Sequence, residues 1–165
     1  MNRKGFTLVE ILIVVIILGI LAAIVIPQFT EASNDARESA LKSDLQTLRS
    51  QLELYKVQHH DNYPNYEHDG DDWVADADAA NFVSRLTERT NAKGTVMPDG
   101  GDAADYPFGP YLQKMPSNPF ALANDAAVDI VAADPAAGTT DGDPGWYFST
   151  ASGTLGPNDP DHDDM

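Results

Sequence analysis

The chain has 165 residues, which is room for one domain of ordinary size plus an additional element. It contains no cysteine, and this excludes a disulfide framework, a thiolate zinc site and a cysteine nucleophile. The 26 acidic residues outnumber the 10 basic ones, giving a net charge of -16, so nucleic acid is not an expected partner. All of the excess charge lies in residues 61–165, because residues 1–60 hold equal numbers of acidic and basic side chains.

The first part of the chain is strongly apolar. Residues 6–26 contain one charged side chain, Glu10, and a helix of that length spans ~30 Å, about the hydrocarbon thickness of a bilayer. Arg3 and Lys4 precede the segment, and the positive-inside tendency places Met1 in the cytoplasm and the bulk of the chain outside. A secretory signal peptide is the weaker interpretation, because its apolar stretch is shorter. The segment predicts a transmembrane helix. A plain single-pass anchor is the alternative, but it leaves the carboxylate within the span unexplained.

The residues around the start of this segment carry a motif. Residues 4–10 read Lys-Gly-Phe-Thr-Leu-Val-Glu and lead into the uninterrupted apolar stretch. This pattern resembles the class III leader and cleavage site of type IV pilins and type II secretion pseudopilins. The resemblance implies that residues 1–5 form a leader, that a prepilin peptidase cuts between Gly5 and Phe6, and that it methylates the new N-terminus at Phe6. It also implies that Glu10 neutralises the N-terminal amine of a neighbouring subunit during filament assembly.

Two residues are expected to weaken the apolar helix. Gly19 is flexible, and Pro27 lacks the N–H that would bond to Ala23. A helix bend is therefore expected at Pro27. In related filaments the stretch between such residues is often partly unwound, and the resemblance extends this expectation to the present chain.

Residues 27–60 are polar but continue the helical pattern. Apolar side chains recur at spacings of four and three residues, at Leu41, Leu45, Leu48, Leu52 and Tyr55. This stripe is typical of a helix with one packed face. We expect the face to pack against the C-terminal part of the same chain, because the stripe is too short to argue for a coiled coil.

Residues 61–165 are predicted to form an acidic head. The Tyr63-Pro64 turn ends the long helix, and a second helix is expected from Asp76 to about Asn91. Asp76 or Asp78 is its expected cap, with Phe82, Val83 and Leu86 facing the core. Residues 109–120 resemble the Tyr-Leu-x-x-hydrophobic-Pro-x-x-Pro segment of major pseudopilins. Residues 145–149 and 153–156 predict a short hairpin that packs on the helix through Trp146 and Phe148, or alternately through Tyr147. The expected fold is α+β, the pilin fold: a long N-terminal helix packed by its second half on a head with a short helix and a minor antiparallel sheet.

Two groups of residues are candidate metal ligands. Histidine and aspartate gather at His59, His60, Asp61, His68, Asp69, Asp71 and Asp72, although an aspartate-rich loop is usually a solvated surface. Asp141, Asp143, Asp159 and Asp161 are weak calcium candidates, and none of them has the spacing of an EF-hand loop. The resemblance implies one calcium ion in a C-terminal loop, but residues 124–143 depart from that pattern. No cofactor is therefore required, and calcium binding stays open.

The sequence contains no nucleophile elbow and no glycine-rich phosphate loop, so an enzyme is not expected. The resemblance implies a structural subunit of a type II secretion pseudopilus that is held in the bacterial inner membrane before assembly, with its head in the periplasm. Its implied partners are copies of itself, minor pseudopilins, prepilin peptidase and the inner-membrane assembly platform. One alternative is the major pilin of a type IV surface pilus used for adhesion, motility or DNA uptake. Another is a membrane-anchored acidic binding module, for which Glu10 would be dispensable.

Overall fold

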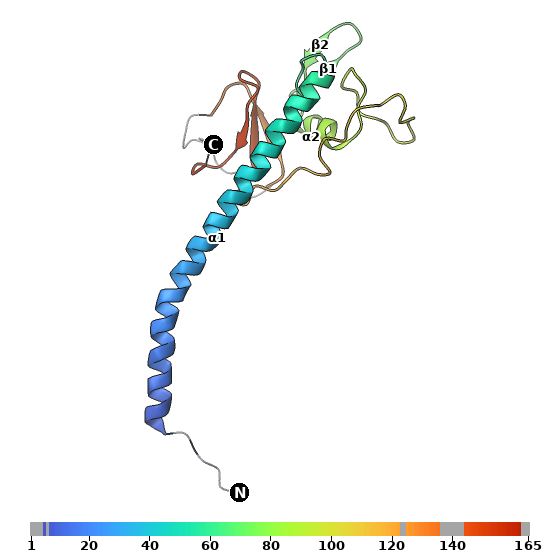
Figure 1. Cartoon of the computed structure of the whole chain (residues 1–165). Coiled ribbons are helices and arrows are strands. Elements are labelled where there is room, and N and C mark those ends of the chain that lie inside the picture. The colour runs from blue at the N-terminus through green and yellow to red at the C-terminus, as the bar shows by residue number, and fades with distance from the viewer. Residues whose placement is uncertain (1–4, 6, 123–124, 136–143, 163–165) are drawn as a thin grey trace. The chain divides into compact units, whose positions relative to one another are not determined.

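The structure, a computed structural model, describes residues 5, 7–122, 125–135 and 144–162. The chain divides into two compact units, residues 1–39 and 40–165. Helix α1 (Leu8–Gln58) contributes its first part to the first unit and its second part to the second unit. Figure 1 shows the order of the elements along the chain.

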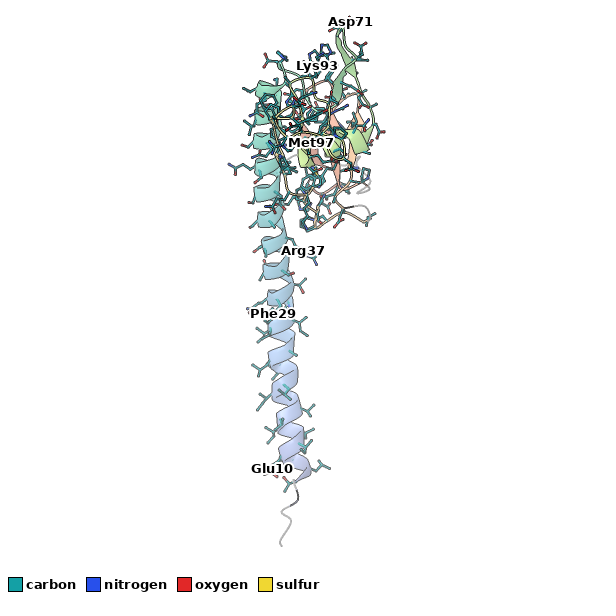
Figure 2. All side chains as sticks on the ribbon, turned by 90° about the vertical axis from the view of Figure 1, so that its right-hand side faces the viewer. Glu10, Phe29, Arg37, Asp71, Lys93 and Met97 are labelled. Atoms are coloured by element: carbon teal, nitrogen blue, oxygen red, sulfur yellow. The ribbon has the colours of Figure 1, made fainter. Side chains whose placement is uncertain are left out.

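In the first unit, α1 exposes apolar side chains on all of its faces. Leu8, Ile16 and Ile26 are 81%, 53% and 64% exposed, and the large apolar residues between them are similar. By length and composition, α1 is the one helix among the described residues that could cross a membrane. The apolar surface continues one turn further to Phe29, which is labelled in Figure 2. A helix that is apolar all round needs an apolar environment, either lipid or neighbouring helices.

The helix runs without interruption through Gly19 and Pro27. Pro27 leaves the carbonyl of Ala23 without its usual donor. One turn later, the Thr30 hydroxyl donates to the carbonyl of Ile26 at 3.3 Å. The partial unwinding that the resemblance implies for assembled filaments, and the bend at Pro27, stay predictions.

The second unit is built on the predicted leucine stripe. All five of its members are buried, with exposed fractions of at most 3%: Leu41, Leu45, Leu48, Leu52 and Tyr55. They share one core with α2 (Ala79–Thr87), with the three-stranded sheet, and with Met115 of the segment at 109–120. The expectation that this face packs on the chain's own head is confirmed, and the coiled-coil alternative is wrong for these residues.

The three-stranded sheet contains the predicted hairpin. Strands β4 (Trp146–Ser149) and β5 (Leu155–Pro157) pair antiparallel, with Phe148 opposite Leu155. The third strand, β3 (Val128–Val131), pairs parallel with β4, so the sheet is mixed and not wholly antiparallel as expected. A parallel pair needs a long connection, and the chain between β3 and β4 is long enough to provide it.

All four side chains of β4 are buried. Trp146 and Phe148 belong to the core cluster, and the Tyr147 side chain is 6% exposed. The first alternative, packing on the helix through Trp146 and Phe148, is therefore confirmed, and Tyr147 is buried as well. Tyr147 lies over Gly156 of β5, where an added Cβ would collide with the tyrosine ring.

The second predicted helix is present but shorter than expected. The Asp78 carboxylate caps α2 by accepting from the Ala80 N–H at 2.9 Å, so Asp78 and not Asp76 is the cap. The helix ends at Thr87 and does not reach Asn91, because Glu88 adopts an extended backbone and Thr90 pairs with Phe108. Tertiary hydrogen bonds thus replace the last predicted turn.

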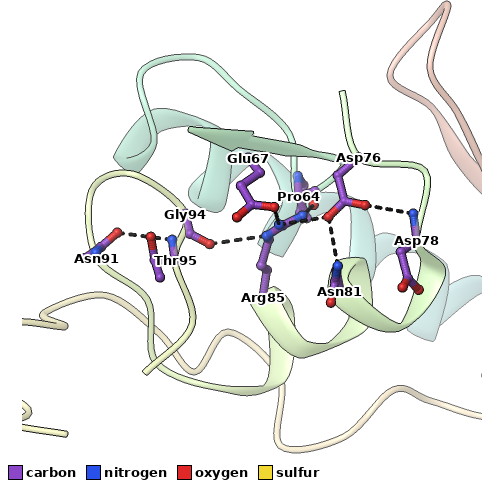
Figure 3. Close-up of polar contacts among 9 residues, drawn as sticks. All are labelled: Pro64, Glu67, Asp76, Asp78, Asn81, Arg85, Asn91, Gly94 and Thr95. Atoms are coloured by element: carbon purple, nitrogen blue, oxygen red, sulfur yellow. Dashed lines mark hydrogen bonds and ion pairs between the residues drawn. The ribbon is translucent and has the colours of Figure 1, made fainter. Parts of the chain in front are cut away.

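Strands β1 (Tyr66–His68) and β2 (Trp73–Ala75) form a separate antiparallel hairpin that was not predicted. Its place in the head is fixed by a buried cation, Arg85, whose side chain is 5% exposed (Figure 3). Arg85 Nη1 donates to the Pro64 carbonyl at 2.7 Å and Nε donates to the Gly94 carbonyl at 3.2 Å. Its Nη2 forms ion pairs with Asp76 at 2.9 Å and with Glu67 at 3.4 Å. One side chain thereby connects α2, the hairpin and the loops on either side of them.

Asp76, whose side chain is 15% exposed, is the main anion of this arrangement. Its carboxylate also accepts from the Asp78 N–H at 2.9 Å and from the Asn81 amide at 3.0 Å. Burial raises the pKa of Asp76, but these two hydrogen bonds and the charge of Arg85 together hold it below its ordinary value. Asp76 is therefore ionised and paired at neutral pH.

Candidate processing and assembly site

The predicted processing site lies at the start of the first unit. Gly5 is exposed, and a Cβ added there would have no atom within 4 Å. Phe6 lies outside the described residues. Thr7 precedes α1, and Glu10 lies in its first turn, as Figure 2 shows. Along the chain, the exposed Gly5 is therefore followed by the start of α1, and the Glu10 carboxylate lies in the first turn of that helix.

Thr7 and Glu10 satisfy each other's polar groups at the helix start. Glu10 Oε2 accepts from the Thr7 backbone N–H at 2.8 Å and from the Thr7 hydroxyl at 2.7 Å. In return, Thr7 Oγ1 accepts from the Glu10 backbone N–H at 3.3 Å. This reciprocal pattern is a capping box, which occupies donors that a helix start otherwise leaves free.

This role of Thr7 was not among the predictions made from the sequence. The signal was present, since Thr-x-x-Glu directly before an apolar run is the sequence pattern of a capping box. The box gives Glu10 partners from its own chain, which lowers the cost of carrying a carboxylate into an apolar layer. It also holds the negative charge beside the positive end of the helix dipole.

We expect Thr7→Val to loosen this helix start, because valine has a similar shape but no hydroxyl. Loss of such a cap costs about 1 kcal/mol, so the amide hydrogens of residues 8–10 should exchange roughly five times faster. Hydrogen exchange of the full chain in detergent micelles measures this effect. Thr7→Ser keeps the hydroxyl and should exchange like the unmodified chain. Equal exchange in the valine and serine variants would contradict the capping role.

The structure does not bring the histidine and aspartate candidates together. His59 is fully buried, with Nδ1 2.8 Å from the Tyr55 carbonyl oxygen and Nε2 3.0 Å from the Thr90 hydroxyl. Its ring stacks on Tyr55 at 3.8 Å, and burial lowers its pKa. His59 is therefore a neutral core residue. Among the residues that the structure describes, no three histidine or acidic side chains are grouped as metal ligands would be.

The calcium candidates divide into two pairs. Asp141 and Asp143 lie outside the described residues. Asp159 is buried, and both of its carboxylate oxygens face His162 Nδ1, at 2.9 and 3.1 Å. Asp161 is exposed and contributes its backbone N–H to Asp159 at 3.1 Å. Calcium takes six to eight oxygen ligands. Within the described part of the chain, Asp159 faces His162 and the Asp161 N–H and has only the exposed Asp161 carboxylate as a neighbouring candidate, a set that does not fit a calcium ion.

Comparison with known proteins agrees with the geometry at the start of the chain. Residues 1–26 match the family model described as the prokaryotic N-terminal methylation motif. This motif, the apolar helix and the α+β head define the class of N-terminally methylated, pilin-like proteins. No solved structure matches the chain.

Similar curated proteins show which family within this class the chain belongs to. Type II secretion system core protein G of Klebsiella pneumoniae is 30% identical over 119 residues, which cover 72% of this chain and 70% of that protein. The core protein G of Pseudomonas aeruginosa is 43% identical over 56 residues, covering 34% of this chain and 39% of that protein. ComG operon protein 3 homolog of Bacillus licheniformis is 26% identical over 105 residues, covering 64% of this chain and 100% of that protein. The chain belongs to the family of type II secretion system core protein G, the major pseudopilins.

Proposed function

We propose that this chain is the structural subunit of a type II secretion pseudopilus and has no catalytic role. The observation that carries the proposal is the Gly5–Glu10 motif at the start of a helix that exposes apolar side chains on every face. Family membership supports it, although the match spans only 39% of the Pseudomonas aeruginosa relative and 63% of the core protein G of Pectobacterium carotovorum.

The proposed sequence of events follows from the physical chemistry of the first unit. The apolar part of α1 holds the chain in the inner membrane, with Arg3 and Lys4 on the cytoplasmic side and the head in the periplasm. A prepilin peptidase removes residues 1–5 and methylates Phe6. The subunit then exchanges lipid for the helices of neighbouring copies and of minor pseudopilins at an inner-membrane assembly platform. Growth of the fibre drives protein export.

Glu10 directs this assembly in the proposal. The free amine at Phe6 is a cation, and Glu10 is an anion four positions further along the chain. Opposite charges attract strongly in a low-dielectric layer, and each is costly there alone. Pairing between neighbouring copies therefore fixes the register of their helices. To form this pair, the incoming amine has to compete with the Thr7 N–H and hydroxyl for the carboxylate.

Mass spectrometry of the protein from its native membranes tests the processing step. We expect a mature chain that begins at N-methylated Phe6. Gly5→Leu should retain residues 1–5, because the larger side chain occupies the position before the cut. A side chain at Gly5 meets no atom within 4 Å, so retention of the leader reports on recognition by the peptidase and not on misfolding.

Gly19→Ala is the matched control, because a Cβ at Gly19 also meets no atom within 4 Å. This variant should be processed normally. A native chain that keeps Met1, or that is cut beyond Ile26, would remove the filament proposal and favour a membrane-anchored binding module.

A surface pilus is the second candidate, because the ComG operon protein 3 homolog of Bacillus licheniformis, which is not named as a secretion protein, is matched over its whole length. Both candidates share processing and assembly. Immunogold labelling of intact cells separates them, since a surface pilus is labelled outside the cell and a pseudopilus is confined to the periplasm.

A further inference from the structure

Polar contacts hold the last described residues, 158–162, against the rest of the head. The proposed function gives these contacts no role. Asn158 follows β5 and is 7% exposed. Its backbone N–H donates to the Gly145 carbonyl at 3.0 Å, and its side-chain amide donates to the Pro144 carbonyl at 2.8 Å. Two bonds from one residue therefore fix the C-terminal segment against the start of β4.

The next residue, Asp159, is a carboxylate with an exposed fraction of only 3%. His162 lies over it, with Nδ1 at 2.9 and 3.1 Å from the two carboxylate oxygens. The Asp161 N–H donates to the same carboxylate, and the His162 N–H donates to the Asp159 carbonyl at 3.3 Å. The segment thus turns back on itself around one buried anion.

The imidazole of His162 also has a partner across the fold. Its ring stacks on Phe120, with the ring centres 4.1 Å apart and the planes inclined by 29°. Phe120 is held in place because its N–H donates to Asn118 Oδ1 at 2.9 Å. The histidine therefore bridges the C-terminal segment and the loop that contains residues 118–120.

That loop is itself bonded to the start of β4. Asn118 is 1% exposed, and its amide donates to the Gly145 carbonyl at 2.8 Å. Its backbone N–H donates to the Asp125 carbonyl at 2.8 Å. The Asp125 backbone also packs closely against Gly145, and this is possible because glycine has no Cβ, which would collide with Asp125. The Gly145 carbonyl thus accepts from both Asn118 and Asn158, and joins the loop to the C-terminal segment.

A buried carboxylate is costly unless hydrogen-bond donors or a cation compensate it. At Asp159 the Asp161 N–H donates to Oδ1, and His162 Nδ1, which has to carry a proton to face an ionised carboxylate, lies beside both oxygens. We propose that Asn158, Asp159 and His162 form a protein-only latch, in which the imidazole takes the place on Asp159 that a calcium ion would need. The head therefore keeps its C-terminal segment closed without a bound cation.

Hydrogen exchange of the full chain in detergent micelles tests the latch, and it requires no filament. In the unmodified chain, we expect the peptide covering residues 157–162 to exchange at the same rate in excess EDTA and in millimolar calcium chloride. His162→Ala should speed its exchange by about tenfold, the factor expected for the loss of one hydrogen bond to a charged group. His162→Gln keeps an N–H donor and should recover part of the protection.

Asp161→Asn is the control, because its side chain is exposed and only its backbone N–H contacts Asp159. It should leave the exchange of the peptide unchanged. Two results would overturn the latch. One is slower exchange in calcium than in EDTA for the unmodified chain, because a cation would then close the segment. The other is exchange in His162→Ala equal to that of the unmodified chain.

Discussion

Glu10→Gln is expected to abolish filament assembly while leaving the chain in the membrane. Glutamine preserves the size of the side chain but removes the charge that the proposal pairs with the N-terminal amine of a neighbour. An N-terminal amine left without its counter-charge in a low-dielectric layer is strongly unfavourable, so the ratio of filament to membrane-bound subunit should fall by at least ~100-fold. Membrane insertion should be unaffected, because the apolar span is unchanged.

The measurement is the fraction of subunit in sheared filaments relative to the fraction in membranes. Glu31→Gln is the matched control, since Glu31 is an exposed carboxylate of the same helix beyond the apolar span. It should assemble normally. Normal filaments from Glu10→Gln would show that charge pairing does not direct assembly, and would favour an anchored module for which this residue is dispensable.

Arg85→Leu is expected to destabilise the head more than any exposed substitution. The change leaves Asp76 without its cation and leaves the Pro64 and Gly94 carbonyls without their donor. Removing one partner of a buried ion pair typically costs about 3–5 kcal/mol. Guanidinium denaturation followed through tryptophan fluorescence reports on the head, because Trp146 lies fully within its core. Lys93→Ala changes an exposed cation beside the same loop, labelled in Figure 2, and should stay within ~0.5 kcal/mol of the unmodified chain.

The ion pair between Arg85 and Asp76 also predicts that the stability of the head depends on pH. The pKa of Asp76 is lowered in the folded head, so its pairing contributes stability above the ordinary carboxyl pKa of ~4 and loses that contribution as the pH falls through the lowered value. The unmodified chain should therefore lose more stability between neutral and acidic pH than Arg85→Leu does. Two results would show that Arg85 is not the cation that holds the hairpin. One is an equal loss of stability in the two chains on acidification. The other is a free energy of unfolding for Arg85→Leu within ~1 kcal/mol of the unmodified chain at neutral pH.

The sequence by itself was sufficient for the features that local spacing determines. The length of the apolar run predicted a helix that can cross a membrane, and the spacing from Leu41 to Tyr55 identified the buried face of α1. The hairpin of β4 and β5 was also predicted, because its strands are adjacent in the chain. The capping box of Thr7 and Glu10 had an equally local pattern, although it was not recognised.

Only the tertiary structure decided which polar side chains are buried and what compensates them. Arg85 bonds to residues 21 positions before it and nine positions after it, and His59 reaches Thr90, 31 positions away. Asp159 resembles its exposed neighbours in sequence, and its burial beneath His162 depends on a loop that contains Phe120. The parallel pairing of β3 with β4 is decided in the same way. Periodicity records which face of a segment is apolar, whereas the partner of a buried charge depends on the path of the chain between distant segments.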